Sequence, residues 1–226
     1  MSNSLHGKSV LLVGATGGLG MALATELASR GAVLTLSGRN VDVLRSIDLD
    51  YKLHSADLRT PEACENAVTV AIAHGGKLDV VINAVGVVAF GTIEDLSIDT
   101  MEELFLTNTF IPIMLAKIAL GRMSEGGTIV NISGVIAEQN LPGMAAYGAS
   151  KAAVASFSQA LTREARRKKI RVLDARPPHT NTALSQHPIE GTAPHMPEGL
   201  AAEHVARVIC DAIENEISEL PSTAFA

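Results

Sequence analysis

Residues 10–20 read VLLVGATGGLG, and this stretch decides the fold class. An apolar run ends at Val13, a glycine-rich segment follows directly, and Leu19, Leu23 and Leu27 then recur every four positions. That order predicts a buried strand, a tight turn and a helix. Glycines let the backbone approach a ligand closely, and a helix N-terminus offers unpaired N–H groups to an anion. The turn therefore favours a pyrophosphate site, the alternative being a glycine-rich turn without a ligand.

Short apolar runs recur along the chain and are separated by longer stretches with helical spacing. The predicted strands cover residues 10–13, 33–36, 80–82, 129–132 and 170–173, with a weaker run at 52–56. Most are continuous rather than alternating, which is typical of strands covered on both faces. The alternation predicts an α/β fold: a single doubly wound domain over residues 1–226, with a mostly parallel sheet and helices on both faces. A last helix is predicted over about 201–214.

Composition excludes several classes of protein. The chain has 226 residues, of which 47% are hydrophobic, and its formal net charge is −6. An acidic chain does not attract a phosphate backbone, so we expect no nucleic-acid partner. The longest apolar run, 80–90, is too short to span a bilayer. Two cysteines define neither a disulfide framework nor a metal cluster. We expect a cytoplasmic protein that does not bind a membrane.

The irregular segment 177–199 holds five of the nine prolines and three histidines. A loop of this length in a compact domain is usually functional, so we predict a substrate loop, with 183–197 as a mobile lid. Metal binding by His179, His187 and His195 is conceivable, but no carboxylate or cysteine accompanies them at a known ligand spacing. We therefore predict no metal site.

The order of these motifs resembles the short-chain dehydrogenase/reductase family from Lys8 to about Thr182. The glycine spacing at 14–20, the element NAVG at 83–86 and the sequence YGASK at 147–151 follow one another as in the family. The resemblance implies a Rossmann-type fold and a nicotinamide cofactor. The cofactor-binding residues it implies are Gly14, Thr16, Gly17, Gly18, Leu19, Gly20, Arg39, Asp57, Leu58, Asn83, Ala84, Val85, Gly86, Tyr147, Lys151, Pro177, Thr180 and Thr182.

Charge at the end of the second predicted strand bears on the choice of cofactor. An NAD site usually carries a carboxylate there, which would repel a 2′-phosphate. This chain has Gly38 followed by Arg39, whose planar guanidinium can bind a phosphate bidentately. We therefore predict NADP rather than NAD. Two observations oppose this choice: a lone surface arginine is often only solvated, and many NADP-linked relatives carry a second base where this chain has Gly17.

Tyr147 and Lys151 are four residues apart, so on a helix both point to one face. A tyrosine hydroxyl with a pKa near 10 is a poor catalyst at neutral pH. We expect the nearby ammonium to bring that pKa closer to the working pH. By resemblance, Tyr147 donates a proton to the carbonyl oxygen during reduction and Lys151 also holds the nicotinamide ribose.

Asn108 matches the family's mid-helix asparagine, which supports a water chain leading from the lysine. Pro112 stands four residues later and removes the hydrogen bond that would occupy the carbonyl of Asn108. The freed carbonyl can hold a water, or Pro112 can simply bend the helix to fit its neighbour. Both readings stay open at this point.

The chain departs from the family at the serine that binds the substrate carbonyl. That position is Gly134, and Ser133 precedes it. Adjacent side chains on an extended segment face opposite ways, so Ser133 reaches the substrate only if Gly134 allows a local twist. Three alternatives follow: Ser133 turns in, another donor substitutes, or the protein is a slow or inactive binder. We favour the first.

The resulting hypothesis is an NADP-dependent oxidoreductase that interconverts a carbonyl and an alcohol of a small-molecule substrate, with Tyr147, Lys151, Asn108 and Ser133 as catalytic residues. A dinucleotide-binding sensor without turnover is the first alternative. A sugar-nucleotide epimerase or dehydratase ranks last, because only about 44 residues follow Thr182. The resemblance also implies a homodimer formed by the helices around Asn108 and Tyr147, with a tetramer as a further option.

Overall fold

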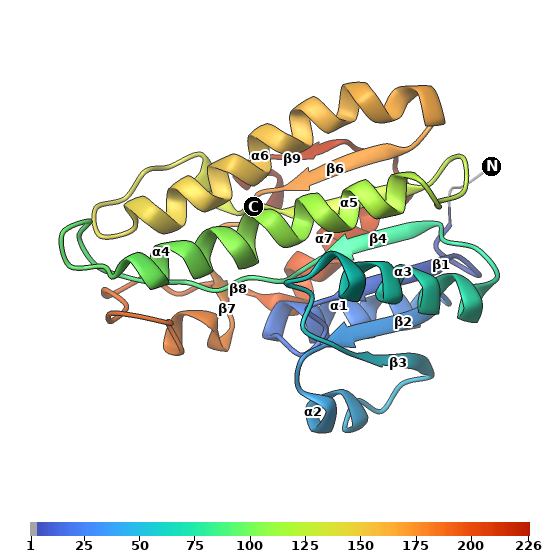
Figure 1. Ribbon diagram of the computed structural model, residues 1–226, viewed down its shortest axis with the longest axis horizontal. Helices are drawn as coiled ribbons and strands as arrows, with labels where there is room; N and C mark the ends of the chain where they lie inside the picture. Colours follow the sequence, from blue (N-terminus) through green and yellow to red (C-terminus); the bar gives the residue numbers. More distant parts are fainter. Residues whose placement is uncertain (1–3) are drawn as a thin grey trace.

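The computed structural model describes residues 4–226, and within that range seven parallel strands form one sheet in the order β3-β2-β1-β4-β5-β6-β9 (Figure 1). The strands are β1 (Ser9–Val13), β2 (Val33–Gly38), β3 (Tyr51–Ser55), β4 (Val80–Asn83), β5 (Thr128–Ile132), β6 (Arg171–Ala175) and β9 (Glu219–Leu220). The predicted parallel sheet is confirmed, and each of the six predicted runs overlaps a strand, with Ala56 and Ile170 lying just outside β3 and β6.

Helices cover both faces of the sheet. They are α1 (Gly18–Ser29), α2 (Val41–Arg45), α3 (Pro61–Gly75), α4 (Ile98–Phe105), α5 (Ile111–Leu120), α6 (Ala145–Ala165) and α7 (Ala202–Glu214). Side chains of α1 and α7 share one core cluster with the sheet, whereas those of α3, α5 and α6 share another. This is the three-layer arrangement expected of a doubly wound fold.

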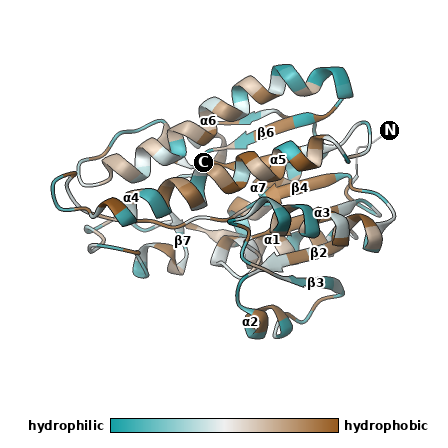
Figure 2. Cartoon of the chain, in the orientation of Figure 1, coloured by the Kyte–Doolittle hydropathy of each residue, from teal (hydrophilic) through white to brown (hydrophobic). Residues whose placement is uncertain are grey.

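Each central strand is buried on both sides because its side chains alternate between the two cores. On β1, Val10 and Leu12 pack towards α1 and α7, while Leu11 and Val13 pack towards α3 and α5. The continuous apolar pattern in the sequence follows directly from this double coverage. Figure 2 shows the apolar colouring on β4 and α5 and the hydrophilic colouring at the far end of α6.

The strand order reverses between β1 and β4, and this reversal positions the candidate site. In the β1–β4 pair Val13 lies opposite Asn83, so both strands end at the same edge of the sheet. The segments that follow them carry the glycine-rich turn and residues 84–86. In doubly wound sheets, ligands bind in the crevice outside such a reversal.

Asn108 lies in a π-helical segment, Leu106–Phe110, that joins α4 to α5. The N–H of Ile111 donates to the carbonyl of Leu106, five residues back, so one residue is inserted into the helix ahead of Pro112.

Among residues 4–226, the stretch Ile98–Leu120 is the one helix long and apolar enough to cross a membrane, but half of its most apolar window is buried inside the protein.

The late segment is only partly irregular. It contains β7 (Thr180–Asn181), a 3-10 turn at Ala183–Gln186 and β8 (Leu200–Ala201), which pairs with β7. Its middle is fastened to the segment after β4, because Ile189 N donates to Val88 O at 2.8 Å and Phe90 N donates to Glu190 O at 3.0 Å. The predicted lid is therefore anchored at residues 189–190.

Candidate active site

The glycine-rich turn packs so closely that side chains have no room. A Cβ on Gly14, which has φ +81°, would lie 2.6 Å from the backbone of Ala84, and one on Gly20 would lie 2.1 Å from the Gly14 carbonyl oxygen. Helix α1 begins after Gly17, which makes no side-chain cap, so the first-turn N–H groups face outward. This is the geometry of an anion site at a helix N-terminus.

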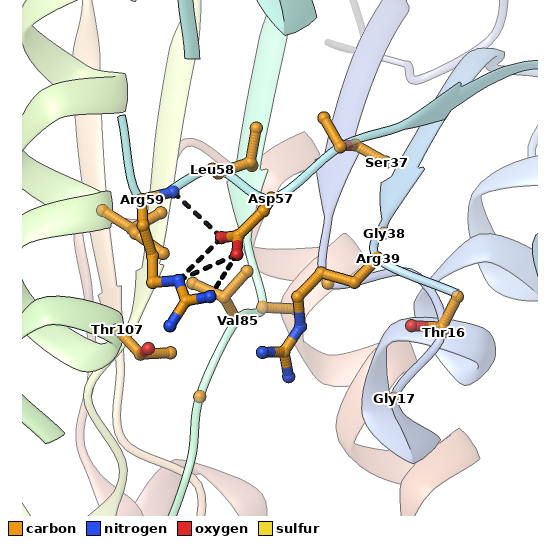
Figure 3. Close-up of a pocket in the computed structure, with 15 residues that line it drawn as sticks. Thr16, Gly17, Ser37, Gly38, Arg39, Asp57, Leu58, Arg59, Val85 and Thr107 are labelled. Carbon is orange, nitrogen blue, oxygen red and sulfur yellow. Dashed lines mark hydrogen bonds and ion pairs between the residues drawn. The ribbon is translucent and has the colours of Figure 1, made fainter. Parts of the chain in front are cut away.

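Beyond the turn lies a first cavity of about 180 Å³, between the ends of β2, β3 and β4 (Figure 3). Gly38 and Arg39 line one side, and Asp57, Leu58 and Arg59 line another. A Cβ on Gly38 would lie 2.8 Å from the side chain of Thr16, so no carboxylate fits at this position. The wall of the cavity therefore carries two guanidinium groups.

Arg59 is a residue that the sequence reasoning missed. It binds both oxygens of Asp57, as the dashed lines in Figure 3 show, and it also reaches Glu103 Oε2 at 3.1 Å. The hydrogen bonds from Arg59, ahead of its charge, lower the pKa of Asp57. The signal available in the sequence was its position two residues after Asp57, directly before the capping residue Thr60 of α3.

A second cavity, of about 260 Å³, adjoins the first. The two share Gly17, Ala84, Val85 and Gly86, so they form one groove along the carboxyl edge of the sheet. Most other predicted residues line this second cavity, namely Gly18, Leu19, Gly20, Ser133, Tyr147, Lys151, Pro177, Thr180 and Thr182. Among residues 4–226, Asn83 and Asn108 are the predicted residues that line neither cavity.

Tyr147 and Lys151 lie one turn apart on α6 and both line the second cavity. Burial lowers the pKa of Lys151 to about 8, and the charge of Asp174 opposes that shift. Burial raises the pKa of Tyr147 to about 12. Our expectation that the ammonium brings the tyrosine pKa down is therefore not met, because the cost of burying a phenolate is larger than the effect of the lysine.

The side chain of Asn108 hydrogen-bonds the backbone of the segment that follows β4. Its Oδ1 accepts from Val87 N and its Nδ2 donates to Val87 O, each at 2.9 Å, and Nδ2 also donates to Ser150 Oγ at 3.0 Å. A Cβ on Gly86 would lie 3.5 Å from both Asn108 Oδ1 and Lys151 Nζ. Asn108 thus fixes the cavity wall beside the lysine.

Ser133 lines the second cavity, but its hydroxyl proton is directed to Asp174, so the expected turn of that hydroxyl towards a substrate is not seen. The side chain is fully buried, and Oγ donates to Asp174 Oδ1 at 2.6 Å. Gly134 does adopt a positive φ of +79°, but the twist leaves Ser133 on the sheet side, where Asp174 provides an acceptor. A Cβ on Gly134 would have only Pro177 O within 4 Å, at 3.9 Å, so the family's serine position is open space.

The groove fits a nicotinamide dinucleotide. The glycine cradle leaves no room for side chains, the uncapped N-terminus of α1 can accept an anion, Gly38 and Arg39 stand at the end of β2 in the first cavity, and the second cavity holds the tyrosine–lysine pair. An extended dinucleotide would place its adenosine end in the first cavity, its diphosphate at the glycine-rich turn and its nicotinamide end in the second cavity.

Comparison with known proteins agrees with this reading. The sequence pattern described as short chain dehydrogenase matches residues 8–192. The chain is similar to the versicolorin reductase stcU of Emericella nidulans, at 33% identity over 74% of this chain and 67% of that protein. It also resembles the structure of a short chain dehydrogenase from Burkholderia cenocepacia in complex with NADP, at 25% identity and a TM-score of 0.86, covering 99% and 100% of the two chains.

A short chain dehydrogenase/reductase from Burkholderia phymatum, in complex with NAD, has the same fold. Its TM-score is 0.87 at 22% identity, covering 97% of this chain and 90% of that one. Structures of this fold are thus known with either dinucleotide, so fold alone does not choose between the two cofactors.

Proposed function

The chain belongs to the short chain dehydrogenase family, and from that premise we propose that it is an NADP-dependent oxidoreductase that interconverts a carbonyl and an alcohol. The observation that carries the proposal is the pair of partly buried Tyr147 and buried Lys151 on one face of α6, where both line the second cavity.

The choice of NADP is supported by the first cavity. Arg39 follows Gly38 at the end of β2, and β2 carries no Asp or Glu. Arg59 lines the same cavity, but it is paired with Asp57 and Glu103, so the proposal rests on Arg39. Arg39 would bind the 2′-phosphate, while the α1 N-terminus would bind the diphosphate.

In the proposed reaction the bound nicotinamide supplies or accepts the hydride. Tyr147 keeps its proton at neutral pH, because burial raises its pKa to about 12, and it therefore acts as the acid that protonates the substrate oxygen during reduction. Lys151 donates to Ile132 O at 2.9 Å, which holds its ammonium beside Gly86. Positive charge at that point stabilises the phenolate left after proton transfer.

The second cavity suits an uncharged, largely apolar carbonyl compound. Its walls include Val88, Phe90, Ile136, Met144 and Met196, and within residues 4–226 no Asp, Glu or Arg lines it. A cationic substrate would find no carboxylate there, and an anionic one would find only Lys151 and His179. The similarity to a protein named versicolorin reductase supports reduction as the direction.

A homodimer through α4, the π-helical segment and α6 is part of the proposal. Ile98 on α4 and Phe110 in the π-helical segment are 66% and 56% exposed, so apolar side chains are available on the elements that this interface would use.

A non-catalytic dinucleotide sensor is the second candidate. Gly134 and the buried Ser133 hydroxyl favour it, because Gly134 carries no donor and the Ser133 hydroxyl donates to Asp174. Losing one such donor costs about 10²–10³ in rate in other enzymes, which is a slow reaction rather than none.

The test is oxidation of NADPH across a panel of apolar aldehydes, ketones and quinones. We expect turnover that Tyr147→Phe reduces by at least about 10³. Tyr51→Phe is the matched control, because Tyr51 is the other tyrosine of the chain and bonds Leu44 O far from the groove. Tight NADPH binding without turnover would support the sensor, and equal loss in both variants would remove Tyr147 from the mechanism.

A further inference from the structure

Asp174 is a buried carboxylate to which the reaction above assigns no task. It lies on β6, is 3% exposed, and lines neither cavity within the part of the chain that the structure describes. Burying a carboxylate is costly unless it is paired or hydrogen-bonded. Its surroundings therefore indicate why the chain keeps it there.

Two groups hold Asp174. Ser133 Oγ donates to Oδ1 at 2.6 Å, and Arg176 Nε lies 3.5 Å from Oδ2. The arginine has further acidic neighbours, since Nε is 3.1 Å from Glu138 and the guanidinium also pairs with Glu219. Arg176 is thus shared among three carboxylates, whereas the Ser133 hydrogen bond is specific to Asp174.

The Ser133 contact leads directly to Lys151. Ile132 precedes Ser133, and its carbonyl accepts the hydrogen bond from Lys151 Nζ at 2.9 Å. Strands β5 and β6 pair so that Asn131 lies opposite Asp174 and Ile132 opposite Ala175, which brings the carboxylate next to this strand end. Burial raises the pKa of Asp174, and the charges of Arg176 and Lys151 oppose that rise. Asp174 in turn favours the ionised form of Lys151, although no ion pair within 4 Å joins these two side chains.

We propose that Asp174 is a positioning residue: through Ser133 it fixes the end of β5 that holds Lys151, and through its charge it keeps Lys151 an ammonium. The inference rests on the proposed oxidoreductase function. It also gives Ser133 a task in place of the substrate contact expected from the sequence. The serine anchors the strand end to a buried anion instead of touching the substrate.

The charged and titratable groups around Lys151 and Asp174 set the sign of the effect. Tyr147 lies one turn before Lys151 on α6, Arg176 directly follows β6, Glu138 follows the turn after β5, and Glu219 is on β9. Replacing Asp174 with a neutral residue removes a nearby anion, which makes loss of the Lys151 proton easier. Catalysis should then fail at a lower pH than in the wild type.

Three variants separate this role from a structural one. Asp174→Asn keeps the shape and removes the charge. Ser133→Ala keeps the charge and removes the hydrogen bond. Ser158→Ala is the control, because Ser158 accepts from Asn131 Nδ2 at 2.9 Å in an equally buried pair between α6 and β5 that does not involve Lys151.

For Asp174→Asn we expect kcat for carbonyl reduction to fall roughly tenfold with KM changed less than about twofold. The alkaline limb of the kcat profile should move to lower pH, so that the ratio of kcat at pH 8 to kcat at pH 6.5 falls about threefold. Ser133→Ala should lower kcat without moving the limb, and Ser158→Ala should change neither quantity.

A second readout does not depend on activity. The protein carrying ¹³Cε-labelled lysine is titrated by NMR, and the Lys151 resonance is identified by its absence in Lys151→Met. It should titrate at lower pH in Asp174→Asn than in the wild type. If Asp174→Asn loses the wild-type circular dichroism spectrum and Asp174→Ala keeps it, Asp174→Ala is used as the neutral variant. An unchanged Lys151 titration in the folded neutral variant overturns the proposal. If the Lys151 titration shifts in the variant but the wild type turns over no substrate, the charge coupling between Asp174 and Lys151 stands and the proposed oxidoreductase function is rejected.

Discussion

The Arg59 guanidinium occupies both carboxylate oxygens of Asp57, with Nε 3.0 Å from Oδ1 and 2.8 Å from Oδ2 (Figure 3). The family resemblance assigns Asp57 to the adenine end of the cofactor. In this chain that carboxylate is oriented by a neighbour that itself lines the cavity. Arg59→Ala should therefore raise the Kd for NADPH about fivefold, the size expected for an exposed ion pair. Calorimetric titration measures this, and an unchanged Kd would remove Arg59 from the binding site.

Arg39 should distinguish the two nicotinamide dinucleotides. It stands where a carboxylate would favour NAD, so Arg39→Ala should raise the Kd for NADPH by roughly tenfold or more and leave that for NADH within about twofold. Arg45→Ala, an exposed arginine on α2 that lines neither cavity, is the control. An equal rise in the Kd values for NADPH and NADH would show that Arg39 does not bind the 2′-phosphate.

The anchored loop offers a test of how the second cavity is closed. Gly191 has φ +77°, and a Cβ there would lie 1.6 Å from Phe90 O, so Gly191→Ala must displace the loop from the segment after β4. We expect KM for the carbonyl substrate to rise severalfold. Gly76→Ala is the matched control, because Gly76 has φ +73° and nothing within 4 Å of its Cβ position. It should cost about 1 kcal/mol of stability and leave KM unchanged.

Lys151 makes stability depend on pH in a definite direction. Burial lowers its pKa to about 8 in the folded protein, against an ordinary value of 10.5 in the unfolded chain. Between these two values the unfolded chain binds the proton and the folded chain releases it, so the free energy of unfolding rises with pH over this window. The wild type should gain up to about 3 kcal/mol relative to Lys151→Met between pH 8 and 10.5. Urea denaturation at several pH values measures this free energy. If it changes with pH equally in the wild type and in Lys151→Met, the lowered pKa of Lys151 is contradicted.

The fold could be predicted because its decisive signals are local. The runs at 10–13, 80–82 and 129–132 are continuous and apolar, which is what double coverage requires, and all lie in strands of the sheet. Thr60 and Pro61 likewise begin α3 as a capping residue and a first-turn proline should, with Thr60 Oγ1 accepting from Ala63 N.

The parts of the site that could not be predicted depend on partners far away in the sequence. The direction of Ser133 is set by Asp174, 41 residues later, and strand alternation alone left it open. The pKa of Tyr147 depends on how deeply its hydroxyl is buried, and the four-residue spacing to Lys151 gives no information on that burial. The π-helical segment at Asn108 is a further example, since Pro112 predicts a disturbed helix but not the form that it takes.

The most direct test of the central claim follows the hydride itself. NADPH carrying deuterium at the transferable position of the nicotinamide is incubated with the enzyme and a carbonyl substrate, and the alcohol is analysed by mass spectrometry. The account predicts one deuterium on the former carbonyl carbon, formed by the wild type and by Tyr51→Phe but lost with Tyr147→Phe. Alcohol formed without deuterium, or labelled alcohol formed equally well by Tyr147→Phe, would contradict it.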